Sequence, residues 1–177
     1  SSQNDDIALN SYFYLARLIA RSDPATGNGM LEDFLQQHPD HPQAGAAAFQ
    51  LAMNRYDAGE YAIAAEGFTQ ALSHTLEQGN AEKARFLLAE SLFLAGSRPQ
   101  ADAAFQDYLE RFPTGRFCDE ALFKQGVAAF EAKDYDRAEE RFSRLPAEHA
   151  QSQKVGMAEF YLGEIAFFGG RYTFALQ

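Results

Sequence analysis

The sequence has little of what builds a disulfide framework, a membrane span or a secretion signal. Its single cysteine, Cys118, excludes an internal disulfide and any metal site made of several cysteines. No apolar run approaches the roughly 18 residues of a membrane-spanning helix, and the first residues, SSQNDD, lack the basic and apolar regions of a signal peptide. We therefore expect a chain that does not insert directly into a membrane.

Basic residues are also scarce. The 177 residues include 15 Lys and Arg against 25 Asp and Glu, which gives a formal net charge of −10. A field of this sign repels phosphate backbones and anionic lipid. No nucleic-acid partner is expected, whereas an acidic groove could attract a basic partner.

Residues for catalysis or metal binding do not gather in the sequence. Only 38-HPDHP-42 brings two of the four histidines together, and zinc needs three or four convergent ligands. The 27-GNG-29 cluster lacks the strand and third glycine of a dinucleotide loop and is interpreted as a loop and helix start. Cys118 has no histidine near it in sequence and is interpreted as a structural thiol. We expect no catalytic residue, no metal and no cofactor.

A repeat of 37 residues dominates what is present. Aromatic side chains recur at this interval in two columns, and small side chains in two more: Tyr12, Phe49, Phe86, Phe123 and Phe160; Tyr56, Phe93, Phe130 and Phe167; Ala52, Ala89, Gly126 and Gly163; Ala64, Ala101, Ala138 and Ala175. Within each unit, apolar residues recur at spacings of three, four and seven, the period of an amphipathic helix. The sequence therefore predicts helical repeats.

Each helical stretch breaks near its middle, which predicts two antiparallel helices per unit. The breaks carry glycine or a Lys-Asp pair, which suit a left-handed helix end, at Gly59-Glu60, Gly96-Ser97, Lys133-Asp134 and Gly170-Arg171. Helix-ending residues then close the units at Pro39, Gly79-Asn80, Pro113 and Pro146. The first unit departs from this pattern, because 22-SDPATGNG-29 stands where its second helix should start. That helix is expected to be short, from about Met30 to Gln37.

These features resemble the tetratricopeptide repeat family. The resemblance rests on a small residue in the middle of each first helix, on the turns 59-GEY-61, 133-KDY-135 and 170-GRY-172, and on Ala, Phe and a final Pro at set offsets. It implies an all-α fold, a right-handed solenoid of about 4.5 helix-turn-helix repeats. One array would span residues 1–177, with repeats starting near residues 8, 45, 82, 119 and 156 and the last one incomplete.

A second, narrower resemblance concerns location. The long period and the helix endings 34-FLQQHP-39 and 108-YLERFP-113 are similar to those of repeat proteins in bacterial cell envelopes. This favours the bacterial periplasm or cell envelope, with the cytoplasm as the alternative. The chain begins with Ser rather than Met, which predicts a processed or excised piece, so the lack of a targeting signal in it does not decide between these compartments.

One face of the first helices carries the candidate partner-binding residues. In the tetratricopeptide repeat family the first helices line a concave groove, so the resemblance places an aromatic stripe at the edge of that groove. The candidates are Phe49, Tyr56, Phe86, Glu90, Phe93, Phe123, Lys124, Phe130, Phe160 and Phe167. The other interpretation is that these aromatic residues only pack between successive first helices, since a folded chain does not leave so many exposed.

The repeats predict a non-catalytic scaffold that binds a segment of a partner protein or peptide in the groove. Only Lys83 and Lys124 are basic on the groove face, too few for the clamp with which some family members hold a C-terminal carboxylate. A neutral or basic segment is therefore expected. The alternative is a structural spacer, or a substrate-recruiting arm of a larger enzyme or assembly.

The last unit stops two residues after Ala175, so its second helix is almost absent. The side chains that should pack on that helix, and are therefore expected to face water, are Leu162, Gly163 and Ala166, with Phe168 beside them. We expect the native protein to continue beyond Gln177, and the incomplete repeat to associate with another copy.

Overall fold

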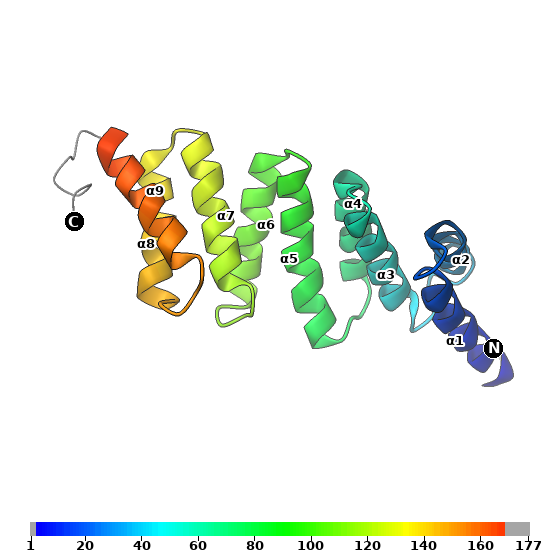
Figure 1. The fold of residues 1–177 in the computed structure, drawn as a ribbon. Coiled ribbons are helices and arrows are strands. Elements are labelled where there is room, and N and C mark those ends of the chain that lie inside the picture. The colour runs from blue at the N-terminus through cyan, green and yellow to red at the C-terminus, as the bar shows by residue number, and fades with distance from the viewer. Residues whose placement is uncertain (1–2, 169–177) are drawn as a thin grey trace. The chain divides into compact units, whose positions relative to one another are not determined.

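The computed structural model describes residues 3–168, a range that holds nine α-helices and no strand (Figure 1). The chain divides into two compact units, residues 1–101 and 102–177. Each unit is described by itself. The alternation of helices and short turns confirms the predicted all-α helical-repeat fold.

The first unit holds five helices. They are α1 (Gln3–Ile19), α2 (Pro24–Gln37), α3 (Ala44–Asp57), α4 (Tyr61–Ser73) and α5 (Gln78–Leu94). Each helix packs against the next along the chain. Phe13, Leu31, Phe34 and Phe68 are each at most 1% exposed, so the core lies between successive helices, where aromatic side chains bury much apolar area.

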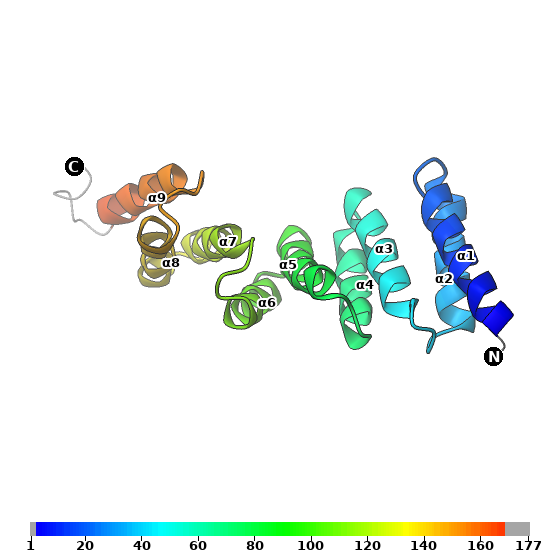
Figure 2. The same ribbon diagram turned by 90° about the horizontal axis from the view of Figure 1, so that it is seen from below.

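The second unit holds most of α6 (Arg98–Arg111), which begins four residues before the division, and then α7 (Cys118–Glu131), α8 (Tyr135–Glu148) and α9 (Val155–Phe168). Helix α8 packs against both α7 and α9. Figure 2 shows α7 and α9 on one side of this unit and α6 and α8 on the other. First helices and second helices therefore form separate layers here.

The predicted break between the first and second helix is confirmed in three repeats. Gly59, Gly96 and Lys133 adopt φ angles of 78°, 81° and 61°, the left-handed geometry that ends a helix. The last predicted break, Gly170-Arg171, lies outside the described residues. In three repeats, therefore, a left-handed turn separates the first helix from the second.

Cys118 opens α7 and is 2% exposed. Its thiol lies 3.0 Å from the carbonyl oxygen of Phe112, to which it donates. This placement agrees with the interpretation of Cys118 as a structural thiol.

The expectation that the second helix of the first repeat is short was wrong. Helix α2 begins at Pro24, because Asp23 caps it by accepting from the backbone N–H and the hydroxyl of Thr26 and proline is favourable at the first helical position. The 27-GNG-29 cluster therefore lies inside the helix. Gly27 is needed there, since a Cβ at this position would lie 2.3 Å from the backbone of Ala20.

At two positions where a repeat was expected to end, the structure differs. Gly79-Asn80 lies in the first turn of α5, which starts at Gln78, and Pro146 lies in the last turn of α8. Helix α8 continues past the proline because the N–H of His149 still donates to the carbonyl of Leu145 and Arg144 pairs with Glu148 at 2.8 Å. Pro146 has no N–H to donate to the carbonyl of Phe142, so the helix loses one backbone hydrogen bond there and continues to Glu148.

Replacing Gly27 should reveal how closely α1 and α2 approach. Gly27→Ala forces a methyl group against the Ala20 backbone, and we expect a loss of about 2 kcal/mol of unfolding free energy. Gly29→Ala is the matched control, because nothing lies within 4 Å of its added Cβ and alanine favours a helix interior by about 1 kcal/mol. Urea denaturation measures both, and equal effects of the two substitutions would contradict the close approach.

Candidate functional site

The predicted stripe falls into two sets, one in each unit. In the first unit, Phe86 is buried and only 5% exposed, whereas Phe49 is partly buried with its ring 6.0 Å from that of Phe68. The ring of Phe93 lies 3.8 Å beneath the guanidinium of Arg98, a favourable cation–π distance. Much of this set therefore packs within the unit.

Tyr56 joins the first helices of two successive repeats. Its ring lies 5.5 Å from that of Tyr61, and the carboxylate of Glu90 on α5 lies close enough to its hydroxyl to affect the ionisation of the phenol. Burial, reinforced by the negative charge of Glu90, raises the pKa of Tyr56 well above its usual value. Of the stripe residues, Tyr56 and Glu90 thus act as a pair between α3 and α5.

A polar network between α2 and α3 was not foreseen. Asn54 donates to Asn28 at 2.6 Å and accepts from Gln50 at 2.9 Å. Arg55 bridges Glu32 and Glu60, each at 2.8 Å. No column of the repeat contains these side chains in register, so periodicity carried no signal for them.

In the second unit, Tyr161 of α9 covers the stripe. Its ring lies 6.1 Å from Phe123, 5.0 Å from Phe130 and, stacked at 6°, 4.8 Å from Phe142. Sequence reasoning missed Tyr161, because its column reads Phe13, Gln50, Leu87, Lys124 and Tyr161. Phe123 and Phe130 therefore contribute mainly to packing in this unit.

Lys124, the one basic candidate, lies beside Glu120 at 3.6 Å. Glu120 also accepts from Lys154 at 2.7 Å, and Lys154 lies 5.5 Å from the centre of the Phe123 ring. The two lysines share the carboxylate of Glu120, in the acidic first turn of α7 that also holds Asp119.

Helix α9 exposes the last two stripe residues. Phe160 is 64% and Phe167 54% exposed, with Phe168 at 56% and Met157 at 45% beside them. Of the side chains expected to face water, Phe168 is exposed and Leu162 and Gly163 are partly buried. The expectation for Ala166 was wrong, because this residue is 6% exposed: it lies on the side of α9 that faces α8, next to buried Ile165.

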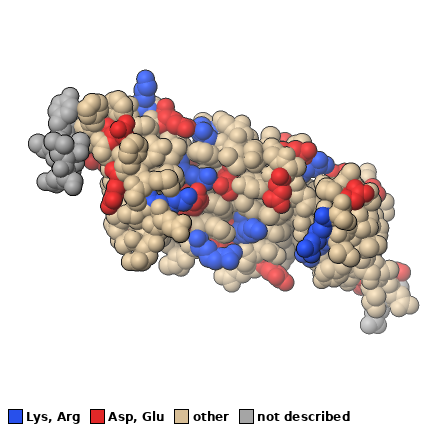
Figure 3. All heavy atoms as spheres, in the orientation of Figure 1, with Lys and Arg blue, Asp and Glu red and all other residues tan. Residues whose placement is uncertain are grey.

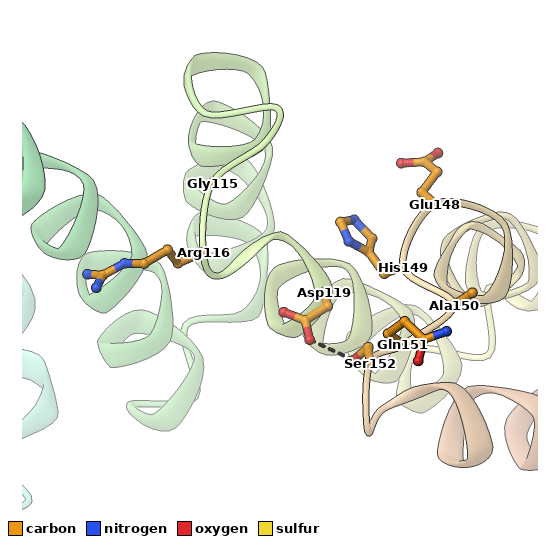
Figure 4. A pocket seen from close by; sticks show the side chains of 8 residues that line it. All are labelled: Gly115, Arg116, Asp119, Glu148, His149, Ala150, Gln151 and Ser152. Carbon is orange, nitrogen blue, oxygen red and sulfur yellow. Dashed lines mark hydrogen bonds between the residues drawn. The ribbon is translucent and has the colours of Figure 1, made fainter.

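Hollows lie outside the stripe in both units. The one in Figure 4, about 370 Å³, lies between the loops before α7 and after α8 and is lined by Asp119, Glu148, His149 and Ser152. The Ser152 hydroxyl donates to Asp119 at 2.6 Å, so its proton is not shared with His149. In the first unit, one hollow of about 410 Å³ lies among α1 and the starts of α3 and α5, and another of about 310 Å³ includes Asp40, His41 and His74.

Charges on the face drawn in Figure 3 are of both signs and interspersed. Within residues 3–168, no three His, Cys, Asp or Glu side chains lie in a group that could hold a metal ion. No described helix is both long and apolar enough to cross a membrane.

The family model of the tetratricopeptide repeat matches residues 49–116 and 86–153. The chain belongs to the tetratricopeptide repeat family. Together the two matches cover more than half of the sequence, and the turns 59-GEY-61 and 133-KDY-135 lie within them. No curated protein sequence is similar enough to count as a match.

Solved structures share the fold at low sequence identity. A tetratricopeptide repeat protein from Parabacteroides merdae is 18% identical with a TM-score of 0.73; the match covers 94% of this chain and 62% of that protein. A MamA chain from Desulfovibrio magneticus RS-1 is 15% identical with a TM-score of 0.70, covering 94% and 89%. YrrB, described as a TPR protein with an unusual peptide-binding site, is 17% identical with a TM-score of 0.70, covering 93% and 79%.

Removing the Tyr161 ring should loosen the second unit. Tyr161→Ala leaves the rings of Phe123, Phe130 and Phe142 without their shared partner, and we expect a loss of about 3 kcal/mol of stability. Phe160→Ala, at a neighbouring ring that is 64% exposed, should cost less than about 0.5 kcal/mol. Guanidinium denaturation compares them, and similar costs would contradict the covering role of Tyr161.

The Tyr56–Glu90 pair should produce an alkaline loss of stability. Since the pKa of Tyr56 is raised in the folded protein, the unfolded phenol ionises first, so its contribution is present below about pH 10 and falls as the pH rises further. Tyr56→Phe should lower the melting temperature at pH 8. By pH 11 the melting temperatures of the variant and the wild type should be nearly equal. Tyr14→Phe, at an exposed tyrosine, is the control. If the difference in melting temperature between the wild type and Tyr56→Phe does not change with pH, the pairing is contradicted.

Proposed function

We propose that the protein is a non-catalytic scaffold whose first helices bind a segment of a partner protein or peptide. The observation that carries the proposal is the exposure of two stripe residues on helix α9, Phe160 at 64% and Phe167 at 54%. Monomers rarely expose contiguous large apolar side chains unless these contact a partner. The family's use as a protein-binding fold agrees with this.

The chemistry of the first helices favours a neutral or basic segment with apolar anchors. Aromatic rings supply most of the affinity in such grooves, and Glu90, Glu131 and Glu164 supply negative charge on the same helices. The net charge of −10 also attracts a basic partner over a distance and so speeds its association. Of the predicted stripe, Phe49, Tyr56 and Phe93 are partly buried and would contribute at their exposed edges.

Three further proposals accompany this one. A structural spacer or substrate-recruiting arm would need no occupied groove. The exposed face of α9 could instead pair with a second copy, in competition with a partner segment. The cell-envelope location rests only on the sequence resemblance and stays a prediction.

Peptide selection tests the binding function. A phage-displayed library of twelve-residue peptides, about that long to span several repeats, should yield neutral or basic sequences with aromatic or aliphatic anchors. The double substitution Phe160→Ser and Phe167→Ser should weaken the selected peptides at least about ten-fold. Ile63→Ser is the matched control, because Ile63 is 52% exposed but lies on the second helix α4.

Two outcomes would count against the groove. If no peptide is enriched over an unrelated carrier protein, the spacer reading is favoured. If Ile63→Ser weakens the peptides as much as the double substitution, the binding surface lies on the second helices instead. Retained helical content of each variant by circular dichroism shows that a loss of binding is not a loss of fold.

A further inference from the structure

Helix α1 is apolar on two opposite sides. One side packs into the first unit: Phe13, Ala16 and Ala20 are 1%, 0% and 8% exposed. The other side carries Ile7, Tyr14, Leu15 and Leu18, which are 58%, 56%, 48% and 63% exposed. Every other described helix of the first unit has at most one exposed large apolar side chain.

The exposed side has the spacing of a helix-pairing seam. Ile7, Ser11, Tyr14 and Leu18 follow one another at intervals of four, three and four, the alternation by which two helices pack along their length. At 100° per residue these four positions fall within about 60° of the helix circumference, directly opposite the buried side. Tyr14 also contacts Phe13 and borders the hollow among α1, α3 and α5, whereas Ile7 and Leu18 stay 58% and 63% exposed within the unit.

We propose that this seam pairs with the same seam of a second copy of the chain, with the two α1 helices antiparallel. A two-fold axis near Tyr12 and Phe13 brings Ile7 of one copy against Leu18 of the other, and Ser11 against Tyr14. The surface is thus complementary to itself, as a two-fold interface requires. This surface is separate from the stripe of the first helices proposed to bind a partner.

Charge fixes the antiparallel orientation. Helix α1 is acidic in its first turn and basic at its end. Asp6 and Arg17 lie on the same flank of the seam, and Arg21 stands in the turn that follows the helix. In the antiparallel pair this flank meets itself, so Asp6 of one copy approaches Arg17 of the other, with Arg21 near it. A parallel pair would instead set the charged flank against the apolar one, and the helix dipoles would repel.

The other flank is apolar. Leu15 lies beside the seam, and the two-fold axis brings it against Ala8 of the second copy. With about 100 Å² from each of the four exposed side chains, the pair buries roughly 800 Å² in total, an area typical of weak, reversible association rather than of obligate dimers. The second copy is therefore expected to bind only at micromolar concentrations and above.

Sedimentation equilibrium of the 177-residue chain tests the pairing from about 1 to 300 µM. We expect a monomer–dimer equilibrium, which Leu18→Lys weakens at least about ten-fold by placing charge in the seam. Phe160→Ser on α9 is the matched control, equally exposed and expected to leave the dimer unchanged. Circular dichroism checks folding, and Ile7→Lys replaces Leu18→Lys if that variant unfolds.

A charge exchange tests the orientation. Asp6→Lys alone should weaken the dimer, because it sets three positive charges against one another on the flank. Adding Arg17→Glu and Arg21→Glu reverses every charge of the contact and should restore the dissociation constant to within about three-fold of the wild type.

Several results would overturn the proposal. A monomeric wild type at 300 µM removes it, as does a dimer that Leu18→Lys leaves intact. A dimer lost with Phe160→Ser and kept with Leu18→Lys assigns self-association to α9. Failure of the charge exchange to restore the dimer rejects the antiparallel orientation. None of these results bears on peptide binding by the first helices, which is measured separately.

Discussion

The fold depends on close contact between the two helices of each pair, which only small side chains permit. A Cβ on Gly126 would lie 2.5 Å from the Phe142 ring, and one on Gly67 would lie 2.9 Å from the Cβ of Ala52. Because the helix axes approach so closely, one side of each first helix is used up in the pair. The stripe lies at the border of this contact: Phe49 and Phe123 touch the second helices of their own pairs, at Phe68 and Phe142, whereas Tyr56 faces Glu90 on the next first helix.

Periodicity predicted the helical pairs well, because a repeat constrains the same position several times. The left-handed turns followed from glycine and from Lys133, which precedes Asp134. The start of helix α2 was missed, because the proline and glycines of 22-SDPATGNG-29 are typical of a loop. The repeat interval does hold its signals: Asp23 stands three repeats before Asp134, which caps α8 in the same way. Gly27 stands in the small-residue column of Ala64, Ala101 and Ala138.

The stripe itself was visible in the sequence, but the distinction between covered and open residues was not. Phe123 and Phe130 are covered because an aromatic residue, Tyr161, replaces the lysine, leucine and glutamine found earlier in its column. Phe160 stands in the same column as Phe123 and yet is exposed. Identical positions in a repeat therefore differ in function according to what the following unit supplies.

The placement of Cys118 has a practical consequence. Its thiol is 2% exposed and turned toward the Phe112 carbonyl, and it is the chain's only sulfhydryl. Thiol reagents in the native protein will thus meet almost no background reactivity. A cysteine introduced at any exposed position can carry a spectroscopic label without first removing the natural one, and distances between labelled repeats become directly measurable in solution.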